Sequence, residues 1–165
     1  MPGHPGLSVV EYHLSIGTVE GVVSLKPAKL PVKPSIKKLK GDCWTLFSRY
    51  IRLRDCLKTT GCTSFGLCIT CGKRYHFKLL QAGHFIGGRH NSNLFNERGV
   101  SAQCYNCNIN LRGATLEYRR KIIEMYGPGA DEELEREAAI VRKFTVEELQ
   151  EKIAYYKAEI KKLEG

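Results

Sequence analysis

Beyond residue 34, apolar positions recur at three- and four-residue spacing, which is typical of amphipathic helices. The pattern predicts a first helix from Ser35, its N-cap, to about Lys58. It predicts three further helices over residues 108–126, 131–143 and 145–163. The second half of the chain is therefore expected to be mostly helical.

The last of these helices is predicted to begin with a capping box formed by Thr145 and Glu148. Its apolar positions alternate by four and three, which is the spacing of a coiled-coil seam: Leu149, Ile153, Tyr156, Ile160 and Leu163. The seam is short, so it suits either a homodimer or packing against the helix that begins at Ser35. We expect a homodimer, although the spacing alone fits both arrangements.

The remaining segments are too irregular for long helices. Residues 9–14 and 18–23 predict two short strands, and residues 26–34 read as an extended linker with three prolines and three lysines. Residues 59–110 are rich in Gly, Cys and Asn, which indicates turns, short strands and a metal-pinned hairpin. The chain therefore divides into three parts: N-terminal strands and basic linker, 1–34; a central unit, 35–127; and a C-terminal helical extension, 128–165.

The composition is that of a folded protein rather than a disordered or membrane one. The 165 residues are 42% hydrophobic, and no segment reaches 18 consecutive apolar residues. The first residues have neither the basic nor the apolar region of an export signal. We expect a cytoplasmic protein without a membrane partner.

The positive charge is concentrated in the middle of the chain. The net charge is +9, and residues 26–78 carry 13 Lys and Arg against two Asp and Glu. Such a concentration indicates a polyanionic partner, because basic side chains release counterions when they neutralise phosphates. On the first predicted helix, Arg49, Arg52 and Arg54 are expected to contact DNA, although a merely solvated basic face has the same pattern.

Four of the seven cysteines form two C-x-x-C pairs that are separated by 32 residues. An odd number of cysteines without an export signal argues against a disulfide framework. Two such pairs can complete one tetrahedral zinc site, and we expect Cys68, Cys71, Cys104 and Cys107 to hold a structural Zn²⁺. A closed site of four thiolates has no open position for substrate, so any chemistry has to come from other residues.

His84 lies between the two cysteine pairs, and Asn108 directly follows the second pair. A zinc ion would tie the two ends of this insert together and bring His84 opposite Asn108, as in ββα-metal nucleases. A neutral imidazole can take a proton from water near pH 7, and an Asn oxygen can help to hold Mg²⁺ or Mn²⁺. The alternatives are a structural role for His84 and a helix N-cap at Asn108. Four further basic residues are candidates for contact with phosphates: Arg89, His90, Arg98 and Arg112.

Several short motifs resemble the phage lambda NinG (Rap) recombination family over about residues 36–160. They are Ala82-Gly83-His84, residues 95–98 (Phe-Asn-Glu-Arg), Gln103-Cys104-x-x-Cys107-Asn108, and Gly113 with the later Tyr118-Arg119. The resemblance implies an endonuclease that cuts branched recombination intermediates such as D-loops and Holliday junctions, encoded by a phage or prophage in a bacterial host. The wider resemblance is to HNH nucleases, with His84 as the base and Asn108 as a ligand of the catalytic metal. It implies an α+β fold with a zinc-pinned HNH-like core flanked by helices.

Three positions depart from the patterns of these families. Gly83 stands where HNH proteins often have an acidic metal ligand, Gly99 replaces the middle Asn, and Ala114 stands where the family has Asn. We therefore expect Asn93, Asn96 or backbone carbonyls to orient His84.

Two other functions fit the same residues. A non-catalytic zinc-ribbon module would bind DNA through the basic helix, and a scaffold built on the C-terminal helices would bind a protein partner. Incubation of DNA with the protein, with and without Mg²⁺, distinguishes these two functions from a nuclease, because only a nuclease would cut the DNA when Mg²⁺ is present.

Overall fold

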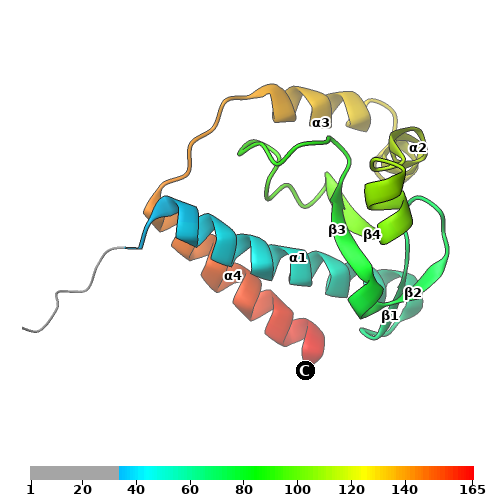
Figure 1. Ribbon diagram of the computed structural model, residues 1–165, viewed down its shortest axis with the longest axis horizontal. Helices are drawn as coiled ribbons and strands as arrows, with labels where there is room; N and C mark the ends of the chain where they lie inside the picture. Colours follow the sequence, from blue (N-terminus) through cyan, green and yellow to red (C-terminus); the bar gives the residue numbers. More distant parts are fainter. Residues whose placement is uncertain (1–33) are drawn as a thin grey trace, which may run out of the picture. The chain divides into compact units, whose positions relative to one another are not determined.

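The computed structural model describes residues 34–165 and combines helices with two small sheets (Figure 1). This mixture confirms the α+β class. The strands predicted over residues 9–14 and 18–23 lie outside the described part. The elements are α1 (Ile36–Thr60), β1 (Phe65–Leu67), β2 (Arg74–His76), the 3₁₀ turn η1 (Phe77–Leu79), β3 (Leu80–His84), β4 (Val100–Cys104), the single π-helical turn η2 (Asn106–Asn110), α2 (Thr115–Tyr126), α3 (Ala130–Ala139) and α4 (Val146–Glu164).

Helix α1 follows the prediction from the apolar pattern. The Ser35 hydroxyl accepts a hydrogen bond from the Lys38 N–H at 3.3 Å, which confirms the N-cap. The helix ends at Gly61, whose φ of 72° is the left-handed conformation that glycine adopts without strain. One long helix therefore runs beside most of the other elements.

Helices α1 and α4 lie side by side and share the largest apolar core (Figure 1). Phe47 of α1 meets Tyr156 of α4 with ring centroids 5.2 Å apart. The capping box of Thr145 and Glu148 is confirmed at the start of α4. All five residues of the predicted seam belong to this core or pack against it: Leu149, Ile153, Tyr156, Ile160 and Leu163. The seam therefore serves an intramolecular contact, and the homodimer stays a prediction that needs another surface.

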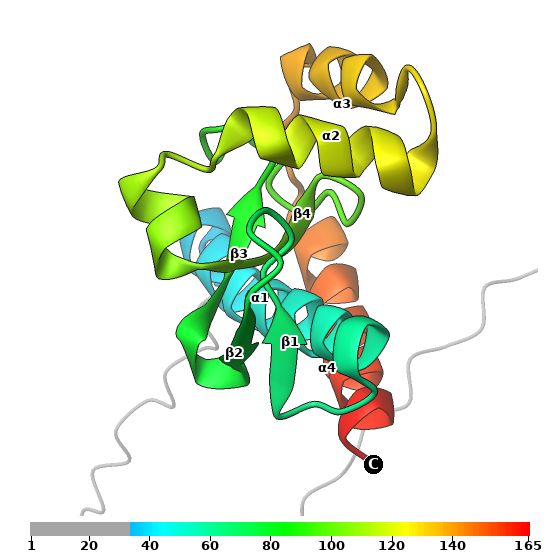
Figure 2. The same cartoon turned by 90° about the vertical axis from the view of Figure 1, so that its right-hand side faces the viewer.

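The strands form two antiparallel hairpins, β1–β2 and β3–β4. In the second hairpin, Ala82 pairs with Ala102, and this face packs toward α1. The opposite face includes Gly83, whose carbonyl accepts a hydrogen bond from the Tyr118 hydroxyl of α2 at 3.0 Å. Strands β3 and β4 thus lie between α1 and α2 (Figure 2).

A buried carboxylate joins α1 to β4. One oxygen of Asp55 accepts from the Ala102 N–H at 2.7 Å, and the other pairs with Arg54 at 2.8 Å. Arg54 also donates to the carbonyls of Glu97 and Val100 at 2.9 and 3.0 Å. This network fixes the hairpin against the helix.

Two predicted helix boundaries are wrong. The helix predicted over residues 108–126 is interrupted: η2 ends at Asn110, and α2 begins only at Thr115. Between them Arg112 and Ala114 have positive φ angles, 50° and 46°, which no helix contains. This turn returns the chain toward the second cysteine pair, where the Gly113 N–H donates to the Cys107 carbonyl at 2.9 Å.

The helix predicted over residues 131–143 ends at Ala139 in α3, and Ile140 is extended. Side chains of the loop before β4 hold the segment that follows. Ser92 donates to the Ala138 carbonyl at 2.7 Å, and Asn91 donates to the Arg142 carbonyl at 2.8 Å. Across residues 34–165, no helix combines the length and the apolar character that crossing a membrane requires.

Candidate functional site

The two cysteine pairs meet at one point of the structure. The sulfur atoms of Cys68, Cys71, Cys104 and Cys107 all lie within 4.8 Å of one another. Cys68 and Cys71 come from the turn between β1 and β2, and the other two flank the start of η2. Four such sulfurs can hold a metal ion such as zinc in a closed tetrahedral site. The predicted ligand set is therefore present as a cluster, and it links the first hairpin to η2.

Backbone N–H groups surround the Cys68 sulfur. The Cys104 N–H donates to it at 3.3 Å, and the Thr70 hydroxyl lies 3.3 Å away. Burial raises the pKa of the Cys68 thiol, but hydrogen bonds from Cys71, Thr70 and Cys104 outweigh burial and lower this pKa to about 7. The surroundings of this sulfur thus favour the thiolate that a metal requires.

His84 is the last residue of β3 and is half-buried. Its ring stacks on Trp44 of α1, with centroids 5.3 Å apart and planes 14° apart. Its Nε2 lies 3.4 Å from the Leu94 carbonyl oxygen. Because a carbonyl only accepts hydrogen bonds, this contact favours the tautomer with the proton on Nε2, in which Nδ1 carries the lone pair.

The environment of His84 favours the neutral imidazole. Burial lowers its pKa, the Leu94 carbonyl raises it, and the positive charge of Arg89 lowers it further. The net direction is downward from the ordinary value. The side chains of Asn93 and Asn96 make other contacts: Asn93 donates to the Ile86 and Gly88 carbonyls, and Asn96 donates to Glu137. The backbone of Asn93, like that of Leu94, hydrogen-bonds to His84 and raises its pKa. Of the three candidates from the sequence, a backbone carbonyl is the group that contacts His84.

Asn108 lies in η2 and packs against β3. Its amide nitrogen donates to the Gln81 side-chain oxygen at 2.8 Å. Its Oδ1 lies 3.1 Å from the position where a Cβ of Gly83 would be. The structure therefore places Asn108 beside Gly83, the residue that precedes His84. The side-chain oxygen of Asn108 takes no part in the hydrogen bond to Gln81.

A cavity of about 310 Å³ opens along the outer edge of β3 next to these residues. Asn108 and Ala82 line it from the hairpin side, and Trp44 and Arg52 line it from α1. Arg89 completes the wall, with its guanidinium 4.4 Å from the centre of the Trp44 ring. The cavity is thus lined by Asn108, by two arginines and by the aromatic partner of His84.

The predicted basic residues do not form one surface. Arg49 pairs with Glu164 of α4 at 2.5 Å, and Arg98 pairs with Glu133 of α3 at 2.8 Å. Arg54 is engaged with Asp55 and two carbonyls inside the protein. Three other candidates are exposed, namely Arg89, His90 and Arg112. Of the three arginines predicted on α1, Arg52 is the one that reaches the cavity beside β3.

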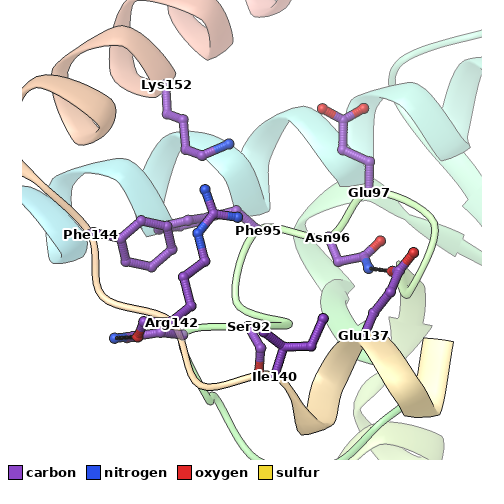
Figure 3. Close-up of a pocket in the computed structure, with 10 residues that line it drawn as sticks. Ser92, Phe95, Asn96, Glu97, Glu137, Ile140, Arg142, Phe144 and Lys152 are labelled. Carbon is purple, nitrogen blue, oxygen red and sulfur yellow. Dashed lines mark hydrogen bonds between the residues drawn. The ribbon is translucent and has the colours of Figure 1, made fainter.

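A second cavity, of about 460 Å³, is lined by the loop that precedes β4 and by the segment that follows α3 (Figure 3). Arg142 and Lys152 line it together with Glu97 and Glu137, and Phe95 forms part of its wall. Neither His84 nor Asn108 lines this cavity. Its mixture of opposite charges does not suit a phosphate.

Sequence reasoning missed the role of Trp44. Trp44, Ser48 and Arg52 follow one another at four-residue intervals, so they form one row along α1, and all three line the cavity. The four-residue spacing of this row is visible in the sequence. It does not stand out, because Trp44 directly follows Cys43, which belongs to the buried face of the helix.

The fold and site define an α+β protein with a cluster of four cysteines, able to hold a metal ion, beside a short hairpin. The family model described as Bacteriophage Lambda NinG protein matches residues 21–165, and the chain belongs to this family. Membership links the chain to phage recombination. No curated protein and no solved structure is significantly similar to it.

Proposed function

We propose that the protein is a metal-dependent DNA endonuclease of the ββα-metal type that cuts branched recombination intermediates. The observation that carries the proposal is the contact between η2 and the end of β3. Asn108 Oδ1 lies 3.1 Å from the Cβ position of Gly83, and His84 is the next residue. Because neighbouring strand residues point to opposite faces, the imidazole and the amide oxygen flank the end of β3 from its two sides.

His84 supplies the general base of the proposed reaction. Nδ1 of the neutral ring accepts a proton from a water molecule, whose oxygen forms a bond to phosphorus. The bond from phosphorus to the leaving sugar oxygen breaks, and this oxygen takes a proton from solvent. The stack on Trp44 and the contact with the Leu94 carbonyl hold the ring and its tautomer in place.

The residues around Asn108 fit a hydrated divalent cation. Mg²⁺ prefers oxygen ligands and keeps several waters, so few protein ligands are needed when a phosphate also contributes. Bound at the Asn108 oxygen, Mg²⁺ or Mn²⁺ would stabilise the charge on the phosphate and on the leaving oxygen. The four cysteines would hold Zn²⁺ with a structural role.

The basic groups next to the cavity supply affinity for DNA in this proposal. The guanidinium groups of Arg52 and Arg89 line the cavity, and Arg112 is exposed in the turn that follows η2. Guanidinium groups bind phosphate oxygens in a bidentate manner, which positions the backbone. The preference for branched DNA comes from the link of the family to recombination.

Cleavage of a labelled four-way junction by the zinc-loaded full chain tests the proposal. We expect cleavage with Mg²⁺ and none when Mg²⁺ is omitted. His84→Ala should cut at least about 100-fold more slowly with nearly unchanged binding, because a general base acts in the transition state. His76→Ala is the matched control, since His76 is exposed on β2. Tight binding without cleavage by the wild type would favour the non-catalytic zinc-ribbon module instead.

A further inference from the structure

Gln103 of β4 has one buried polar atom that the fold leaves without a partner. The side chain is fully buried, and its amide nitrogen donates to the Gly113 carbonyl at 2.9 Å and to the Thr70 hydroxyl at 3.3 Å. Its Oε1 has no hydrogen-bond partner within the described residues. The Gly113 carbonyl only accepts, so the nitrogen has to face it and the oxygen has to point the other way.

The unpartnered oxygen points at Gly83. A Cβ on Gly83 would lie 1.9 Å from Gln103 Oε1, which no side chain could tolerate, and 3.1 Å from Asn108 Oδ1. The donation from Asn108 to Gln81 turns the Asn108 oxygen toward the same place. Two amide oxygens thus converge beside the backbone of Gly83.

The buried Gln103 oxygen lacks a donor, and the Asn108 oxygen lies near the same place. A buried acceptor left unsatisfied costs about 1–3 kcal/mol, and such groups in folded proteins commonly mark a bound ion or water. Amide oxygens are hard ligands that suit Mg²⁺ and Mn²⁺. Because Gly83 has no side chain, Gln103 Oε1 can lie directly against β3, with Asn108 Oδ1 close by.

We propose that Gln103 Oε1 and Asn108 Oδ1 together hold one divalent cation beside Gly83. Gln103 then supplies, from the partner strand, the oxygen that an acidic residue before His84 would otherwise supply. The catalytic use of this cation rests on the proposed function, whereas its binding does not. Both ligands are neutral, so affinity without DNA is low and rises when a carboxylate replaces either amide.

Paramagnetic broadening by Mn²⁺ tests the site in the zinc-loaded full chain without DNA. Mn²⁺ should broaden the side-chain amide signals of Gln103 and Asn108 at lower concentrations than it broadens the signal of Asn110, and excess Mg²⁺ should reverse the effect. Asn110 is a matched reference because it lies in η2 but is exposed. The proposal would be overturned if the Gln103 signals stay sharp while Mn²⁺ binds elsewhere, or if they respond to no cation. A bound water would then be the partner of Gln103 Oε1.

Two charge variants provide a second readout. Asn108→Asp should bind Mn²⁺ about tenfold more tightly than the wild type, because ligand charge sets affinity at oxygen sites. Asn110→Asp adds the same charge nearby and should leave affinity within about twofold, as expected for an exposed charge. Equal gains in both variants would contradict a defined site.

The outcomes distinguish this proposal from the nuclease assignment. Mn²⁺ bound at Gln103 in a protein that does not cut DNA would retain the cation site and reject the nuclease. Mg²⁺-dependent cleavage with no response at Gln103 would retain the nuclease and reject Gln103 as a ligand.

Discussion

The helical side of the molecule and its cysteine-linked side are stabilised in different ways. Helices α1 and α4 bury large apolar side chains against each other, among them Phe47, Ile51 and Leu149, all 0% exposed. The β1–β2 hairpin has three-residue strands, and the cluster between it and β3–β4 has only three buried residues, Cys56, Leu80 and Ala102. Short hairpins with so little apolar contact are marginal by themselves.

The difference indicates where each side obtains its stability. Burial of a large apolar side chain contributes about 1.5–3 kcal/mol, so several such residues stabilise the α1–α4 pair. A metal held by Cys68, Cys71, Cys104 and Cys107 would join the turns of the cysteine-linked side and add to its stability. His84 and Asn108, the residues proposed for chemistry, lie on elements next to this cluster, so we expect their positions to depend on the metal.

Removal of the metal should produce the largest effect. Structural zinc contributes about 10–16 kcal/mol in small zinc domains, so chelation should abolish amide protection in β1–β4 and η2. The α1–α4 interface should keep part of its protection, because its core contains no ligand. Hydrogen exchange with and without a chelator measures both regions. Cys107→Ser should reproduce the loss, whereas the control Cys62→Ser, outside the cluster, should retain one zinc per chain.

Truncation within the helical core should produce a smaller but global effect. Phe47→Ala should lower the free energy of unfolding by about 3–5 kcal/mol, through lost burial and the cavity that remains. Urea denaturation measures the loss, and zinc content should not change in the folded variant. Leu116→Ala, at a side chain that is 74% exposed on α2, should change stability by less than about 0.5 kcal/mol. Similar losses in both variants would contradict the assigned core.

Removal of the buried link between the two sides should produce the next largest effect. Asp55→Ala removes the acceptor of the Ala102 N–H and leaves Arg54 without its carboxylate. We expect a loss of about 3 kcal/mol, because a buried charge without its partner is strongly destabilising. Asp42→Ala removes an exposed pair with Lys38 and should cost about 0.5 kcal/mol or less. Thermal denaturation measures the stability of the two variants. Equal shifts in melting temperature would contradict a linking role for Asp55.

The pH dependence of cleavage should produce the smallest effect. Burial lowers the pKa of His84, so the neutral base persists to a pH below the ordinary value of about 6.5. The single-turnover rate should therefore be level near pH 7 and fall as the pH drops through the lowered pKa, because protonation removes the lone pair of Nδ1. A profile measured from pH 5 to 8 checks this. A midpoint above the ordinary value would contradict the environment described for His84.

The sequence predicted the helical side well because its information is local. Apolar spacing and capping residues set the extents of α1 and α4, including Ser35 and the Thr145–Glu148 box. The four cysteines were found from spacing alone, since C-x-x-C pairs impose the same local geometry in many folds. The spacing of the α4 seam does not predict whether it packs against α1 or against a second chain, because spacing does not identify the partner surface.

The features that were missed depend on contacts between distant segments. The break between η2 and α2 requires left-handed residues at Arg112 and Ala114, which helix periodicity does not reveal. The position of Gln103 against Gly83 follows from the β3–β4 register, which residue types alone do not specify. The burial of Arg54 likewise depends on the loop that precedes β4.

We expect a zinc ion bound by the four cysteines to organise the side of the molecule that carries His84 and Asn108. X-ray absorption at the zinc edge of the purified full chain, combined with metal analysis, tests this expectation. We predict one zinc per chain with four sulfur ligands at about 2.3 Å. A folded, cooperatively unfolding protein that contains no zinc, or zinc bound mainly by nitrogen and oxygen, would contradict it.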